Sequence, residues 1–91
     1  MKSYIDADFL KAYSKLPKEV REQARKAYKL FKKDPYHNSL HFKLVHSGEQ
    51  VYSARIGRGY RALGFKEDNE IFWFWIGSHA EYDTLWSHFN K

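Results

Sequence analysis

The feature that most constrains the fold is a change in the spacing of apolar residues near position 41. Before that position, one set of apolar residues recurs at steps of four, three and four: Val20, Ala24, Ala27 and Phe31. This spacing places them on one face of a helix. After that position, apolar and polar residues alternate in short runs separated by turn residues, which is typical of strands. The chain is therefore expected to place helices first and a sheet after them.

The N-terminal part predicts a short strand and two helices. Tyr4 and Ile5 suit a short edge strand, and Asp6 or Asp8 can then cap a first helix. The apolar residues of this first helix are Phe9, Ala12, Tyr13 and Leu16. Pro17 suits the first turn of the second helix, and Asp34-Pro35 ends it because proline disfavours helical geometry at the residue before it. The two helices are expected to form an antiparallel pair.

The C-terminal part predicts a meander of four strands, at residues 41–46, 50–57, 60–66 and 70–76. The turn residues between them are Gly48, Gly57-Arg58-Gly59 and Asp68-Asn69. Ser78 followed by Glu81 three residues later indicates a capping box that opens a last helix. The apolar residues of that helix are Tyr82, Leu85, Trp86 and Phe89.

The second face of the predicted sheet is unusually apolar. If Ala54 faces the helices, then Ser53 faces away from them, and pairing with the next strand turns Leu63 and Phe65 outward as well. Either this face is covered or the strand is irregular near Gly64. The last strand, Ile71-Phe72-Trp73-Phe74-Trp75-Ile76, is apolar on both sides, which suits a central strand. The last helix or a partner protein could cover it.

Size and composition limit the classes of protein that remain. A chain of 91 residues suits one domain, spanning residues 1–91. It has no cysteine, signal-like leader or membrane-length apolar segment, so a cytoplasmic protein without a membrane role is expected. The formal net charge is +5, and residues 1–43 hold 11 Lys and Arg against 5 Asp and Glu. This balance favours a polyanionic or acidic partner.

The order of short motifs resembles the RelE/ParE superfamily of bacterial toxin–antitoxin proteins, and most closely its small RelE-like toxins. The motifs are Leu16-Pro17-x-x-Val20, Asp34-Pro35, Leu40-x-Phe42-Lys43-Leu44, Tyr52-Ser53-Ala54-Arg55-Ile56, Tyr60-Arg61-Ala62-Leu63 and Trp75-Ile76-Gly77-x-His79-x-Glu81-Tyr82-Asp83. The resemblance covers nearly the whole chain. It implies an α+β fold, in which an N-terminal helical hairpin packs on a twisted, mostly antiparallel four-stranded sheet with a short C-terminal helix.

The resemblance also implies a function. RelE-like relatives cleave messenger RNA on the ribosome and are neutralised by a cognate antitoxin. By that resemblance, Arg61 contacts the scissile phosphate, and His79 and Tyr82 stand where relatives carry proton-transferring groups. Ser53 departs from the pattern, because the RelE type carries a basic residue there. The site could therefore be weakened, differently organised or inactive.

The residue types fit that chemistry on physical grounds. Cleaving RNA without a metal requires proton transfer at two oxygens and neutralisation of charge on the phosphorane. Arg55 and Arg61 suit the last task, because a guanidinium stays protonated and can bind two phosphate oxygens. Histidine, present here as His79, is a side chain that commonly transfers protons in catalysis. We therefore assign Arg61, His79 and Tyr82 as catalytic, and Arg55, Arg58 and Lys43 as substrate-binding.

Other interpretations remain open at this level. The arginines could be solvated or paired with Glu67 or Glu70, and Tyr82 could simply pack the last helix. His37, His41 and His46 do not share a helix face, so no metal site and no cofactor are expected. A basic ridge on the second helix could bind ribosomal RNA: Lys18, Arg21, Arg25, Lys29 and Lys32. The alternatives to an mRNA-cleaving toxin are a ParE-type gyrase inhibitor and a non-catalytic, antitoxin-binding member.

Overall fold

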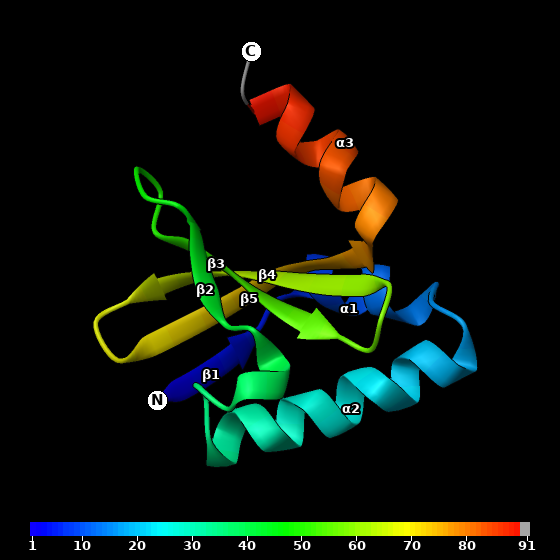
Figure 1. Cartoon of the computed structure of the whole chain (residues 1–91), viewed down its shortest axis with the longest axis horizontal. Helices are drawn as coiled ribbons and strands as arrows, with labels where there is room; N and C mark the ends of the chain where they lie inside the picture. The colour runs from blue at the N-terminus through cyan, green and yellow to red at the C-terminus, as the bar shows by residue number, and fades with distance from the viewer. Residues whose placement is uncertain (90–91) are drawn as a thin grey trace.

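A computed structural model describes residues 1–89, except for the side chains of Trp86, His88 and Phe89 (Figure 1). The elements follow in this order: β1 (Lys2–Ile5), α1 (Ala7–Ser14), α2 (Lys18–Lys33), a short 3₁₀ helix η1 (Asn38–Leu40), β2 (Lys43–His46), β3 (Val51–Ile56), β4 (Tyr60–Glu67), β5 (Glu70–Ser78) and α3 (His79–Phe89). Helices α1 and α2 lie on one side of the sheet, and α3 extends away from it at the end of β5. The predicted order of helices, sheet and last helix is confirmed.

The sheet has five strands in the order β1-β5-β4-β3-β2, so the expected count of four is wrong by one strand. Strands β2 to β5 form the predicted antiparallel meander, whereas β1 pairs with β5 in parallel. The N-terminal segment is fixed there by backbone bonds, with Lys2 N donating to Asn69 O at 2.9 Å and Asp6 N to Trp73 O at 3.2 Å. The edge strand therefore makes the sheet mixed and makes β5 an internal strand.

Both N-terminal helices begin where the sequence predicts. The Asp6 carboxylate caps α1 by accepting a hydrogen bond from Phe9 N at 2.8 Å, and Pro17 stands at the N-cap of α2. Helix α1 packs mainly on β5, and α2 packs mainly on β3. Their apolar residues form the core with the inner face of the sheet, where Phe31 meets Trp73 edge to face at 5.2 Å between ring centroids. The predicted helical stripe is thus the packing face of α2.

On the outer face of the sheet, opposite α1 and α2, both alternatives expected near Gly64 are present. The strand is irregular there, and part of the face is covered. A β-bulge shifts the pairing of β4 with β5 between Leu63 and Gly64. A Cβ at Gly64 would lie 2.9 Å from the Trp73 ring, so glycine lets the strands approach there. Leu63 is covered, with 1% of its surface exposed, whereas Phe65 stays 42% exposed. One end of this face is therefore closed and the other is open.

Helix α3 begins with the predicted capping box. Ser78 N donates to Glu81 Oε1 at 3.0 Å, and Glu81 N donates to Ser78 Oγ at 3.1 Å. The start of the helix contacts β4 and β5 before the helix leaves the sheet. The predicted apolar roles of Trp86 and Phe89 lie outside the described side chains. Within residues 1–89 no helix combines the length and apolar character needed to cross a membrane.

Candidate functional site

The arginines of the hairpin meet on the outer face of the sheet. Arg55 and Arg61 are direct Cα partners across β3 and β4, and Arg61 is in turn opposite Gly77 on β5. A Cβ at Gly77 would lie 2.6 Å from the Trp75 ring, so only glycine fits beside that indole. The start of α3 is tied to the hairpin turn, because His79 N donates to Gly59 O at 2.8 Å. Sheet register and this bond together place a histidine beside two arginines.

Arg61 is held in place by two neighbours. Its Nη1 donates to Ser53 Oγ at 2.7 Å, and its guanidinium carbon lies 5.3 Å from the centre of the Tyr82 ring. Ser53 is fully buried, so it offers a fixed acceptor rather than a solvated one. The serine that departs from the RelE-type pattern therefore anchors the neighbouring arginine. The remaining guanidinium donors can still bind an anion.

Arg55 is oriented by the turn and by a histidine from outside the sheet. Its Nε donates to Gly57 O at 2.8 Å, and its Nη1 lies 3.5 Å from His41 Nε2. Arginine can only donate, so this contact requires the lone pair of His41 Nε2. His41 has φ 45°, in the left-handed region, directly after η1. That turn brings the His41 ring toward the arginine.

His79 is exposed and has ring and carboxylate neighbours. Its ring stacks against that of Tyr82, with centroids 5.9 Å apart and planes at 26°. Its Nε2 lies 3.7 Å from Asp83 Oδ2, one helical turn further along α3. More than half of each of these two side chains is exposed, which leaves the imidazole accessible to a ligand. Asp83 can orient the ring without burying it.

These residues surround an open depression of about 300 Å³. Its lining residues are His41, Arg55, Arg58, Tyr60, Arg61 and His79. The lining contains three guanidinium groups and two imidazoles and no carboxylate. Within residues 1–89, neither Arg55 nor Arg61 forms an ion pair with Glu67 or Glu70. A phosphate group would meet positive charge and hydrogen-bond donors from several sides.

The structure gathers four of the six predicted site residues in this depression and places the other two near it. Tyr82 lies beneath Arg61 and against His79. Lys43 is exposed and pairs with Ser53 across β2 and β3, so it lies on the strand next to that of Arg55 and two strands from that of Arg61. Sequence reasoning missed His41 as a site residue, and it also missed Tyr60 and Asp83. The proximity of His41 depends on the turn at η1, which no sequence motif indicates.

No metal site is evident in the part of the chain that the structure describes, since no three His, Cys, Asp or Glu side chains there cluster suitably. His37 Nδ1 instead lies 2.9 Å from Ser39 Oγ, in the loop before β2. The imidazole and guanidinium groups around the depression offer proton transfer and charge neutralisation.

A second surface lies at the open end of the outer face, where aromatic rings cross three strands. We call it the aromatic ladder, and its members are Tyr4, Phe65, Phe72 and Phe74. Tyr4 stacks on Phe72 with centroids 5.0 Å apart, and Phe65 stacks on Phe74 at 4.7 Å. The Tyr4 hydroxyl also donates to Glu70 Oε2 at 2.9 Å, and this bond raises the pKa of Tyr4. Tyr4, Phe65 and Phe72 are exposed and Phe74 is half-buried, and exposed apolar patches are typical of interaction surfaces.

A helical layer on a five-stranded mixed sheet, with a cationic depression beside the last helix, defines a class of small basic α+β proteins. A family model described as the ParE-like toxin domain matches residues 18–84. The chain therefore belongs to that family and is a toxin of the RelE/ParE superfamily. Among curated proteins, no significant match to the sequence was found.

Solved structures show the same fold. The toxin–antitoxin complex RelBE of Escherichia coli contains a chain with 24% identity and a TM-score of 0.63, covering 85% of this chain and 94% of that one. The RelB–RelE complex of Methanococcus jannaschii contains one with 16% identity and a TM-score of 0.72, over 89% and 96%. YafQ of Escherichia coli matches at 12% identity and a TM-score of 0.70, also over 89% and 96%. At these identities the likeness concerns the fold.

Proposed function

We propose that the protein is a metal-independent endoribonuclease that cleaves messenger RNA on the ribosome in the cytoplasm and is neutralised by a cognate antitoxin. The observation that carries this proposal is the depression, in which three arginines and His79 converge without a carboxylate in the lining. A catalytic site for phosphodiester cleavage needs such an excess of donors over acceptors. Membership of a toxin family supports a role as a toxin.

The reaction follows from the groups present. The 2′-oxygen of the RNA attacks phosphorus, the bond from phosphorus to the 5′-oxygen breaks, and a 2′,3′-cyclic phosphate and a 5′-hydroxyl result. One group accepts the 2′-hydroxyl proton and another donates a proton to the leaving oxygen. His79 and Tyr82 perform these transfers, while Arg61 and Arg55 neutralise the phosphorane. Arg58 and Lys43 bind phosphates on either side of the reacting one.

Ser53 determines how this site differs from a lysine-rich one. A lysine at this fully buried position would displace the hydroxyl on which Arg61 rests. Here Arg61 is positioned by a neutral acceptor, and the positive charge comes from Arg55, Arg58 and Arg61 rather than from position 53. The departure at Ser53 is therefore compatible with activity.

The test is cleavage of a message during translation in a purified system. We expect Arg61→Ala to slow cleavage about 10²–10³-fold, as loss of a charge-stabilising donor does. We expect His79→Ala to slow it about 10²–10⁴-fold, as loss of a general acid or base does. Arg61→Lys keeps the charge and should restore only part of the rate.

Two matched controls accompany these variants. Lys33→Ala removes one positive charge at the exposed end of α2, and His37→Ala removes an exposed imidazole before β2. Both should cleave at the wild-type rate. Wild-type rates in Arg61→Ala and His79→Ala would remove the assigned roles, and equal losses in the controls would point to a charge or folding effect.

The antitoxin is proposed to cover the aromatic ladder with an amphipathic, acidic segment. The ladder supplies apolar area, and the net charge of +5 on the whole chain favours an acidic partner. Phe65→Ala and Phe72→Ala should each weaken binding of the cognate antitoxin more than tenfold. Tyr36→Ala alters an aromatic side chain that is 61% exposed but outside the ladder, and it should bind normally.

A second candidate is gyrase inhibition, which the ParE-like description of the matching family favours. It predicts accumulation of cleaved DNA–gyrase complexes in the presence of the protein. It also predicts no dependence on His79, because no proton transfer to RNA takes place. A gyrase cleavage assay run beside the message assay separates the two functions. Inactivity in both assays would indicate a non-catalytic, antitoxin-binding member.

A further inference from the structure

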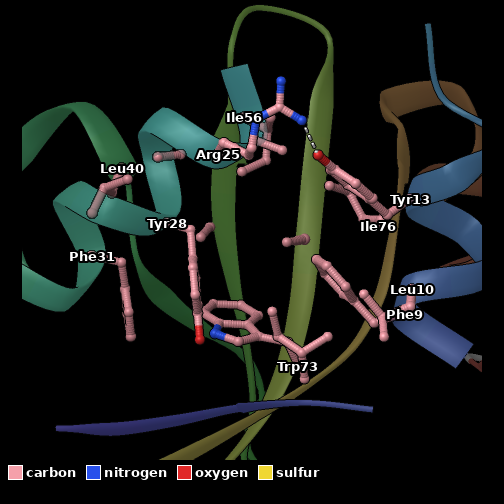
Figure 2. A pocket seen from close by; sticks show the side chains of 15 residues that line it. Phe9, Leu10, Tyr13, Arg25, Tyr28, Phe31, Leu40, Ile56, Trp73 and Ile76 are labelled. Atoms are coloured by element: carbon pink, nitrogen blue, oxygen red, sulfur yellow. Dashed lines mark hydrogen bonds between the residues drawn. The ribbon is translucent and has the colours of Figure 1, made fainter. Parts of the chain in front are cut away.

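The side of the sheet that α1 and α2 cover contains an apolar cavity of about 150 Å³, which shares no lining residue with the arginine depression (Figure 2). Helix α1 packs mainly on β5 and α2 mainly on β3, so the inner face of β4 between them is only partly covered. The residue of β4 that faces this gap is Ala62, and its cross-strand partner is Ala54. Ala24 and Ala27 of α2 also line the space. Small side chains on both layers thus keep it open.

The walls of the cavity are mostly aromatic. Figure 2 shows Phe31 and Tyr28 on one side, Phe9 and Tyr13 on the other, and Trp73 at one end. The lining offers almost no polar surface, so water has few partners inside and the space favours an apolar occupant. Flat ring walls favour a planar guest over a branched one, because rings stack or meet edge to face.

The cavity has access to solvent along the seam between α1 and α2. Leu10 lines it and is 54% exposed. At the end opposite Trp73, Arg25 Nη1 donates to the Tyr13 hydroxyl at 2.6 Å, and this bond joins the two helices across the cavity. Arg25 is exposed and lies on the edge of the lining. A ligand could therefore enter at the seam without unfolding the sheet.

We propose that this cavity is a binding site for a small uncharged aromatic molecule of one ring or two fused rings. In another protein, a cavity of about 150 Å³ with aliphatic and aromatic walls binds benzene. The rim offers donors at Arg25, which suits a ligand with at most one polar atom. A cation is excluded, because it would lose its hydration in the apolar interior and face the Arg25 guanidinium at the rim.

Binding is measured with benzene and indole as probes, by thermal unfolding and by NMR of protein carrying ¹³C-labelled alanine methyls. A ligand at ten times its Kd should raise the Tm of a chain of this size by roughly 5–10 °C. The chain has seven alanines, four of which line the cavity. Ring currents should shift the methyl signals of Ala24, Ala27, Ala54 and Ala62. The signals of the remaining alanines, Ala7, Ala12 and Ala80, serve as internal controls.

Two variants and one probe decide the result. Ala27→Leu fills the cavity from α2 and should abolish both the Tm shift and the methyl shifts. Ala80→Leu makes the same change on the exposed face of α3 and should keep both. Benzamidine, a cation with the same ring, should give neither. If Ala27→Leu does not fold, the methyl map of the wild type still decides. Uniform or absent shifts at the four lining methyls would overturn the proposal.

Discussion

The hydrogen bond from Arg61 to Ser53 should contribute to the free energy of unfolding, and its geometry sets the expected size of that contribution. The distance of 2.7 Å is short for a nitrogen donor, and the donor is charged. Such bonds contribute about 1.5–3 kcal/mol when desolvated. Ser53 is fully buried, but Arg61 is only half-buried and can return to water when its acceptor is lost. We therefore expect the pair to contribute about 1–2 kcal/mol to the free energy of unfolding.

The measurement is a double-mutant cycle by urea unfolding of wild type, Ser53→Ala, Arg61→Ala and the double variant. Ser53→Ala should lower the unfolding midpoint by roughly 0.5–1.5 M urea, given the slopes usual for small proteins. The same substitution in the Arg61→Ala background should cost little, which gives a coupling energy of about 1–2 kcal/mol. Ser47→Ala, at an exposed turn serine, should change stability by less than about 0.5 kcal/mol. A coupling energy below about 0.5 kcal/mol would refute the anchoring role of Ser53.

Three further perturbations test other parts of the fold. Gly57 has φ +56°, and a Cβ there would collide with the Gln23 side chain, so Gly57→Ala should lower the free energy of unfolding by about 1–2 kcal/mol. Gly59 has open space around it, so Gly59→Ala should lower it by less than about 0.5 kcal/mol. Equal losses in the two variants would show that the turn is not strained. Leu63→Ala should lower the free energy of unfolding by about 2–5 kcal/mol because the side chain is 1% exposed, and Leu44→Ala, at 42% exposure, should lower it by under about 1 kcal/mol. Chemical denaturation measures both values. A small loss in Leu63→Ala would mean that the outer face of the sheet is not closed at this residue. Because the pKa of Tyr4 is raised in the folded protein, the stabilisation that this tyrosine provides is complete below its ordinary pKa of 10.0 and is lost as the pH rises through the higher folded value. Wild type should therefore lose stability relative to Tyr4→Phe above about pH 10. Parallel pH profiles of the two proteins would contradict this.

Local patterns in the sequence were sufficient to predict most elements of the fold. The stripe that ends at Phe31 identified α2 because helical periodicity is a local property. The capping box of Ser78 and Glu81 located the start of α3 for the same reason. A short strand at Tyr4 and Ile5 was predicted, but its place in the sheet was not, because β1 pairs in parallel with β5, a partner more than sixty residues away. The sheet therefore has five strands instead of the expected four. No local sequence pattern indicates a pairing between strands so far apart in the chain.

The candidate site was predictable to the extent that strand register determines it. Arg55 and Arg61 pair because a short glycine-containing turn fixes the register of the hairpin. His41 was missed, because its position depends on a left-handed residue after a single 3₁₀ turn. The burial of Ser53 was missed as well, since alternation predicted only that it faces away from α1 and α2. Both misses concern contacts between segments that are distant in sequence.

The most direct test of the account is cleavage of a ribosome-bound message in which the ribose at the cleaved position lacks its 2′-hydroxyl. The proposed chemistry requires that oxygen as the nucleophile, with His79 and Tyr82 moving protons while Arg55 and Arg61 neutralise the phosphorane. We expect rapid cleavage of the all-ribose message, with a cyclic phosphate and a 5′-hydroxyl at the new ends, and no cleavage at the modified position. Equal cleavage of both messages, or no cleavage of either by protein that is folded and free of antitoxin, would contradict it.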